Sequence, residues 1–276
     1  MATRMRQVIL RALPDLRVHP VGKWVRASAF GRTIVDSRRV QLVCEPRRVV
    51  GSYAVPEEDI AGQLVPAEGE AAAENPVPMD DDGPPVLDPH TPFGAHTTPG
   101  TPLTIRTDAG DLPGAAFRPD DPDLAGCVVL DWDAFAQWYE EDEPVLAHPR
   151  DPFDRIDCLR SSRHVVIASD GVTLADTTRA TLLFETPLPT RYYVPREDVA
   201  MNLLDRTDSH TLCAYKGEAS YWSARIGDTV LPDVAWSYEE PRHDAAPVAG
   251  LIAFYTEKLD LAVDGELQRR PRTPWS

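Results

Sequence analysis

The chain lacks the features that mark several large classes of protein. It has no run of about 18 apolar residues, so we expect no membrane-spanning helix. Its four cysteines lie far apart and form no CxxC pair, which argues against a zinc site built from paired ligands. No apolar run near the start is long enough for a signal peptide, so we expect reduced thiols and a cytoplasmic location.

Basic residues are also scarce. The chain has 28 Lys and Arg against 44 Asp and Glu, and a net charge of −16. This balance argues against broad nucleic-acid binding, which needs clustered basic side chains. The sequence contains no GxSxG, P-loop, GxGxxG or HExxH motif, so it names neither a reaction nor a cofactor, and we expect no metal site.

What the chain does contain is an internal repeat. Gly31–Glu45 matches Gly171–Glu185, with Gly, Thr, Asp, Arg, Leu and Glu recurring at the same spacing, and Tyr53–Ile60 then matches Tyr192–Val199. Two weaker matches follow in the same order, Trp132 with Trp236 and Arg155–Asp157 with Lys258–Asp260. A colinear series of this kind indicates a duplicated domain.

We therefore predict a mainly β protein of two compact domains, each a twisted sheet or open barrel with one or two short helices. Residues 1–160 form a degenerate first copy, and residues 161–276 form the second copy. The 27 prolines favour short strands and loops over long helices. We expect the two domains of the chain to contact each other.

The first copy carries an acidic, proline-rich insert at about 66–102. This segment has nine prolines, seven acidic residues and no Lys or Arg. Such a composition buries little apolar surface, so we expect an extended or disordered loop. We interpret Asp80–Asp82, with His90 and His96, as part of this solvated loop rather than as a metal site.

Two local patterns in the second copy predict defined structure. Ser169-Asp170-Gly171 lies between two runs of β-forming residues, and Asp-Gly is a strong hairpin signal. Pro195 is suited to the first position of a short helix, with Glu197 and Asp198 in its first turn, which we expect to reach about Leu204.

The second copy resembles a known family, the domain of unknown function numbered 427. The resemblance rests on several blocks in order, from about 165 to 266: Tyr-Tyr-Val-Pro-Arg-Glu-Asp-Val at 192–199, Cys-Ala-Tyr-Lys-Gly-Glu-Ala-Ser-Tyr-Trp at 213–222, Ala-Trp-Ser-Tyr at 235–238, Ala-Pro-Val-Ala-Gly at 246–250 and Ala-Phe-Tyr at 253–255. It implies a small, mainly β domain from a bacterial protein, with no established activity. The family also has a nucleotidyltransferase-like label.

The densest stretch of reactive and binding groups is residues 213–222. Lys216 could hold an anion or act as a desolvated amine, and Cys213 could be a nucleophile if a neighbouring cation lowered its pKa. The alternatives are a surface turn for Lys216 and an inert, packed thiol for Cys213. These two residues are the catalytic candidates, and Lys216 is preferred.

Further side chains could complete a ligand pocket. An arginine at 196 could clamp a carboxylate or phosphate, and aromatic rings commonly line small-molecule sites, although they also fill cores. The predicted ligand-binding residues are Arg196, Tyr193, Tyr215, Glu218, Tyr221, Trp222 and Trp236. The first copy has Glu57 in place of Arg196, and we match the 213–222 block with a region around 108–117 that has no similar residues. Residues found only in the second copy are therefore the better functional candidates.

Three functions remain open at this point. The first is binding of a small anionic or polar metabolite in an aromatic-lined pocket of the second domain, possibly with catalysis. The second is a non-enzymatic protein-interaction module, favoured by the acidic insert and the absence of a standard catalytic set. The third is a nucleotidyltransferase-like activity, implied only by the family label.

Overall fold

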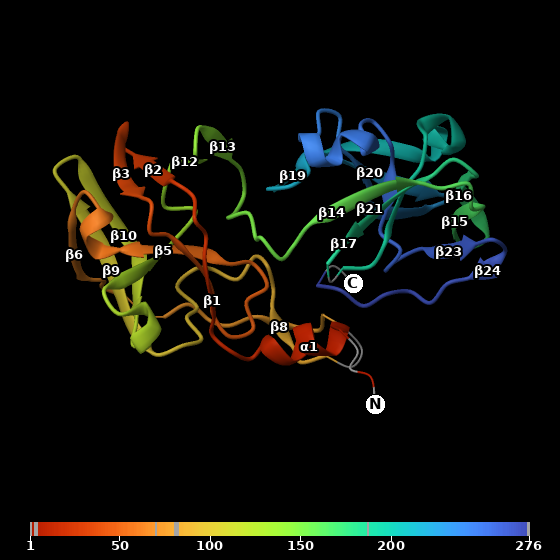
Figure 1. The fold of residues 1–276 in the computed structure, drawn as a ribbon. Coiled ribbons are helices and arrows are strands. Elements are labelled where there is room, and N and C mark those ends of the chain that lie inside the picture. The colour runs from red at the N-terminus through yellow and green to blue at the C-terminus, as the bar shows by residue number, and fades with distance from the viewer. Residues whose placement is uncertain (1, 3–4, 70, 80–82, 187, 275–276) are drawn as a thin grey trace. The chain divides into compact units, whose positions relative to one another are not determined.

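The computed structural model describes residues 2, 5–69, 71–79, 83–186 and 188–274. The chain divides into two compact units, Met1–Asp151 and Pro152–Ser276 (Figure 1). The structure confirms the mainly β prediction, since strands dominate both units and form several open sheets. No helix in the described part of the chain is long and apolar enough to cross a membrane.

The first unit consists of two larger sheets and a small one. A seven-stranded sheet has the order β1-β4-β5-β11-β10-β9-β6, a four-stranded sheet the order β13-β12-β2-β3, and β7 pairs with β8. The elements are α1 (Met5–Ala12), β1 (Arg17–Pro20), β2 (Val25–Ala29), β3 (Arg32–Ser37), β4 (Gln41–Cys44), β5 (Ser52–Pro56), η1 (Glu57–Asp59), β6 (Gln63–Pro66), β7 (Pro76–Val77), β8 (Val86–Leu87), β9 (Gly100–Thr107), β10 (Gly110–Pro119), η2 (Pro122–Leu124), β11 (Cys127–Leu130), β12 (Gln137–Glu140) and β13 (Glu143–Val145).

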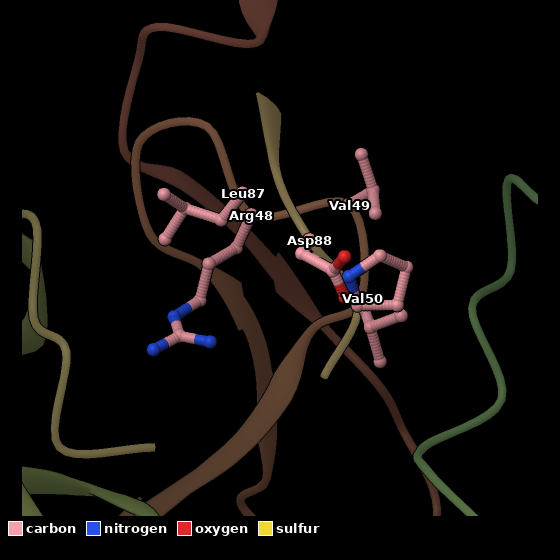
Figure 2. Close-up of a pocket in the computed structure, with 6 residues that line it drawn as sticks. Arg48, Val49, Val50, Leu87 and Asp88 are labelled. Carbon is pink, nitrogen blue, oxygen red and sulfur yellow. The ribbon is translucent and has the colours of Figure 1, made fainter. Parts of the chain in front are cut away.

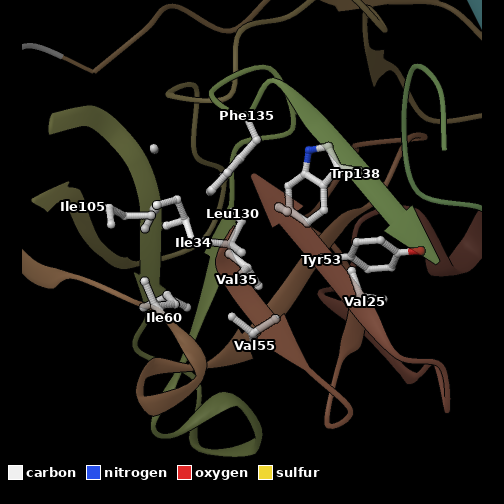
Figure 3. Packing of buried hydrophobic residues seen from close by; sticks show 14 of the residues in the cluster. Val25, Ile34, Val35, Tyr53, Val55, Ile60, Ile105, Leu130, Phe135 and Trp138 are labelled. Atoms are coloured by element: carbon white, nitrogen blue, oxygen red, sulfur yellow. The ribbon is translucent and has the colours of Figure 1, made fainter. Parts of the chain in front are cut away.

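The main core of this unit lies between the two larger sheets. Strand β5 shows why both faces of the seven-stranded sheet are covered: Tyr53 and Val55 point into the main core, whereas Ala54 points into a second apolar cluster on the other face. Tyr53 and Trp138 pack against each other in the main core, with ring centroids 5.9 Å apart (Figure 3). This apolar core therefore holds the strands of the seven-stranded sheet in fixed positions.

The second unit has three sheets, ordered β14-β17-β18, β16-β15-β23-β24 and β19-β20-β21-β22. The elements are β14 (Ile156–Arg160), β15 (Val165–Ser169), β16 (Val172–Thr177), β17 (Thr181–Glu185), β18 (Arg191–Tyr193), η3 (Arg196–Asp198), η4 (Met201–Leu203), β19 (Leu204–Cys213), β20 (Gly217–Ile226), β21 (Thr229–Ser237), η5 (His243–Val248), β22 (Ala253–Phe254), β23 (Asp260–Val263) and β24 (Glu266–Leu267).

Two apolar clusters also lie on the two faces of the second unit's strands. The inner cluster includes Trp222 and Ala235, and the outer cluster includes Tyr221 and Trp236. The alternation follows from strand geometry, because neighbouring residues point to opposite faces. Strands β20 and β21 are thus buried on both sides, and the outer cluster includes Ala245 and Val248 from η5.

The predicted hairpin at Ser169-Asp170-Gly171 is confirmed. Strands β15 and β16 pair across it, and both central residues have positive φ, 49° at Asp170 and 78° at Gly171. The β2–β3 hairpin of the first unit has the same turn, with φ of 54° at Phe30 and 71° at Gly31. Positive φ at both positions is what a tight turn between twisted strands requires.

Two other local predictions differ from the structure. The expected helix from Pro195 to Leu204 is two separate 3₁₀ turns, η3 and η4, because Val199 has an extended backbone and forms a bridge with Ala175. The insert at 66–102 is not a solvated loop throughout: Val86 and Leu87 are fully buried. These apolar residues supply burial that the average composition of the segment conceals. Asp80–Asp82 lie outside the described residues.

Candidate functional site

The Lys216 ammonium lies in a buried ion pair. Its Nζ is 2.6 Å from both carboxylate oxygens of Glu185, and the two side chains are only 11% and 9% exposed. Burial lowers the pKa of Lys216, but the adjoining Glu185 carboxylate more than offsets this effect, so the pKa is raised. Lys216 is therefore a charged structural partner of Glu185, not the neutral amine that nucleophilic catalysis needs.

The rings predicted to line the pocket divide between the two faces of the sheet. Tyr193, Tyr221 and Trp236 belong to the outer apolar cluster, where Trp236 Nε1 donates to the Tyr193 hydroxyl at 3.2 Å. Burial raises the pKa of Tyr193, which keeps its hydroxyl protonated. Trp222 belongs to the inner cluster instead. Tyr221 and Trp222 therefore cannot line one pocket wall, since they are adjacent in a strand.

The remaining candidates of the 213–222 stretch occupy different surroundings. Cys213 ends β19, opposite Gly217, and is half-buried. Tyr215 is buried in the turn between the strands. Glu218 is exposed and lies 3.0 Å from His210, whereas Lys216 pairs with Glu185.

A different group of charges gathers on the inner face of β20 and β21. The guanidinium carbons of Arg196 and Arg206 lie 5.4 Å and 5.7 Å from the centre of the Trp222 ring, which is itself 3% exposed. Arginine over an aromatic face is attracted by the ring quadrupole, so the indole holds both groups in place. The cations come from η3 and β19, elements that the fold brings to one buried ring.

Two buried hydroxyls and one carboxylate complete this group. Ser220 is directly opposite Ser237 across β20 and β21, and Arg206 donates to Ser220 Oγ at 3.0 Å. Ser237 Oγ donates to Glu239 Oε1 at 2.9 Å, and Glu239 in turn lies 3.5 Å from Arg196. Arg206 thus connects Ser220 to the indole, and Arg196 connects Glu239 and Ser237 to it. We name this group the arginine site: Arg196, Arg206, Ser220, Trp222, Ser237 and Glu239.

The structure therefore brings together Tyr193, Tyr221 and Trp236 on one face and Arg196 with Trp222 on the other, whereas Lys216 pairs with Glu185. Sequence reasoning missed Glu185, although its recurrence at Glu45 in the repeat was a usable signal. It also missed Arg206, which lies opposite Trp222 only because of the register between β19 and β20. No pattern within β19 marks that residue.

Matching strand registers identify the corresponding positions in the first unit. Leu103 is opposite Ala116 as Trp222 is opposite Ala235, and each pair lies beside a shift in register. Leu103 thus takes the place of Trp222, and Phe117 the place of Trp236. The repeat in the sequence predicts instead that Trp132 corresponds to Trp236 and residues 108–117 to the 213–222 block, and both predictions are wrong by these registers.

The charges at these positions differ. Glu57 stands where the second unit has Arg196, and Arg118 stands where it has Ser237; the two form a bidentate ion pair at 2.6 and 2.9 Å. The buried Glu45 carboxylate, which corresponds to Glu185, accepts from the Thr97 amide and contacts His96. The first unit thus keeps the buried carboxylate but neutralises the position of the arginine site internally.

A small pocket also lies in the first unit, with ≈ 180 Å³ of empty space that is partly open to solvent. It is lined by Arg48, Val49, Val50, Leu87, Asp88 and Pro89 (Figure 2). The Arg48 guanidinium donates to the carbonyls of Thr91, Pro92, Phe93 and Ala95. Its donors therefore anchor the insert. Among the described residues, no three His, Cys, Asp or Glu side chains form a group that could hold a metal ion.

Comparison with protein families assigns the second unit. Residues 157–265 match the model of a family described as a domain of unknown function, DUF427. The second unit is a DUF427 domain. The match includes both the Lys216–Glu185 pair and the arginine site, and leaves the first unit unmatched. A search of curated proteins finds no match for the chain.

Proposed function

We propose that the DUF427 domain binds a small anionic molecule, and that Arg196 and Arg206 hold its anionic group beside Trp222. The observation that carries the proposal is the placing of two guanidinium groups around one buried indole, where Glu239 is the one carboxylate that pairs with either of them among the described residues. A guanidinium presents paired N–H donors that match a carboxylate or phosphate.

Arg206 is the better placed of the two cations. Its only hydrogen-bond partner in the described chain is the neutral Ser220 hydroxyl, so its charge is not cancelled by a carboxylate. Arg196 is 44% exposed and its contact with Glu239 is long, at 3.5 Å. Both groups can reach a ligand from solvent while the indole limits their motion, which reduces the entropy lost on binding.

Lys216 has a different part in this proposal from the one that the sequence predicted. Because both oxygens of Glu185 contact its ammonium, Lys216 fixes the turn between β19 and β20 instead of holding the anion. The aromatic cluster on the outer face includes Tyr221 of β20 and Trp236 of β21. We infer that this face stabilises the strands on which Ser220 and Trp222 are carried.

We also propose that the first unit is a diverged copy of the same domain. The shared hairpin turn, the shared register shifts and the recurrence of a buried carboxylate at Glu45 and Glu185 support this. In this copy, the Glu57–Arg118 pair occupies the position of the arginine site, so anion binding is assigned to the second copy alone. The four free thiols support a cytoplasmic location, which cell fractionation would test.

Isothermal titration of the whole chain with inorganic phosphate and with ATP tests the proposal. Arg206→Gln should weaken binding about tenfold or more, since a charge-assisted hydrogen bond contributes about 1.5–3 kcal/mol and tenfold is about 1.4 kcal/mol. Arg225→Gln is the matched control: Arg225 lies on the same sheet, is 61% exposed and pairs with Asp205. Equal losses in the two variants, or no binding by the unmodified chain, would contradict the proposal.

A further inference from the structure

The Glu239 carboxylate is an unusual neighbour for an anion-binding group. Its side chain is 45% exposed, and Oε1 is shared between the Ser237 hydroxyl at 2.9 Å and Arg196 at 3.5 Å. A carboxylate paired with one of the two guanidinium groups repels an incoming anion, so it weakens a site that binds anions alone. A positive group on the ligand would remove this penalty.

The Arg196–Glu239 contact is too loose for simple mutual neutralisation. The ion pair at the corresponding position of the first unit, Glu57–Arg118, is bidentate at 2.6 and 2.9 Å. At 3.5 Å, Arg196 and Glu239 each keep donor or acceptor capacity for a third party. The site thus presents two positive groups over one indole, and a negative group that contacts one of them.

We propose that the ligand of the arginine site is zwitterionic, with an anionic group and an ammonium group close together, as in a free α-amino acid. Its carboxylate accepts from Arg196 and Arg206, and its ammonium donates to Glu239. This inference rests on the proposed function, because it assigns the ligand class of the same site. The buried Ser220 and Ser237 hydroxyls position the two ends, since Ser220 accepts from Arg206 and Ser237 donates to Glu239.

Two probes that differ only in the ammonium group distinguish a zwitterionic ligand from a purely anionic one. We would titrate the whole chain with L-norvaline and with pentanoate, and with inorganic phosphate as the reference anion. The expected result is about tenfold or greater preference for L-norvaline, typical of one added charge-assisted contact. Glu239→Gln should remove that preference and leave phosphate binding intact or stronger.

Glu240→Gln is the matched control, since it removes the neighbouring exposed carboxylate, and it should keep the preference for L-norvaline. Three results would overturn the zwitterion assignment and leave the proposal of anion binding intact. The first is equal binding of L-norvaline and pentanoate, and the second is binding of phosphate but of neither probe. The third is a preference for L-norvaline that persists in the Glu239→Gln variant. Absence of phosphate binding together with preferential L-norvaline binding would overturn the simple anion proposal and retain the zwitterion. If no probe binds, both fail.

Discussion

The two units share a framework and differ in the charges attached to it. In the first, Asp59 accepts from Arg39 at 2.7 Å; in the second, Asp198 accepts from Arg179 at 2.8 Å. Each pair connects the 3₁₀ turn after the central strands to the segment after a hairpin. Contacts that recur in both units in this way are explained by the fold alone.

The differences concentrate at one position. Where the first unit has Leu103 and a closed Glu57–Arg118 ion pair, the DUF427 domain has Trp222 and the loosely paired Arg196. The strands around this position are alike in the two units. The fold therefore does not require Trp222 and Arg196 at this position. The comparison therefore separates the ion pairs that recur in both units from the cations of the second unit that are available to a ligand.

The largest effect that we predict is at the buried carboxylates. Lys216→Met should lower the free energy of unfolding of the second unit by about 3–5 kcal/mol, because Glu185 would remain buried without its cation. In the first unit, His96→Phe should cost only about 1–2 kcal/mol, since the Thr97 amide still donates to Glu45. Urea unfolding measures both losses, and hydrogen exchange assigns each to its unit.

The double variant Lys216→Met/Glu185→Leu is the control for this prediction. Replacing both charges by apolar groups should restore most of the lost stability, because the cost lies in an unpaired buried charge. A double variant as unstable as Lys216→Met would show that packing, not charge, dominates this position.

A smaller effect on the free energy of unfolding is predicted at acidic pH. Burial raises the pKa of Glu257, but the two hydrogen bonds from Arg191, both 2.7 Å, outweigh it and the net pKa is lowered. A lowered folded pKa adds stability above the unfolded value of about 4.3, and this stability is lost as pH falls through the folded pKa. Glu257→Gln should therefore flatten the pH dependence of stability below about pH 4.3.

The first unit supplies the contrast for this experiment. It has Ser52 at the position of Arg191, since Ser52 is opposite Val43 as Arg191 is opposite Leu183. Hydrogen exchange of residues 5–69 should therefore be the same in the Glu257→Gln variant and the unmodified chain. If Glu257→Gln left the pH dependence of the second unit's stability unchanged, the Arg191–Glu257 ion pair would not be a source of that dependence.

Much of the fold could be predicted because it depends on local signals. The Asp170-Gly171 turn follows from two residues that tolerate positive φ, and the blocks that recur along the sequence predicted similar elements in both units. The break at Val199 could not be predicted, since its extended backbone depends on a bridge to Ala175 from a distant strand. The packing of Val86 and Leu87 was hidden by averaging composition over the insert.

The candidate site was only partly predictable for the same reason. Arg196 could be identified because Glu57 stands at the matching position of the first unit, but Arg206 contacts Trp222 through a register that includes an irregularity between Arg206 and His210. The separation of Tyr221 from Trp222 was available from strand alternation alone.

The central claim, that only the second unit binds an anion, is tested most directly by the indole N–H resonances in one nuclear magnetic resonance titration with inorganic phosphate. Trp222→Phe assigns the Trp222 signal, and Trp24, Trp132 and Trp138 report on the first unit. We predict a saturable shift of Trp222 that Arg206→Gln suppresses, with the three first-unit signals unmoved. A shift at Trp132 or Trp138 in place of Trp222, or no shift at any indole, would contradict the account.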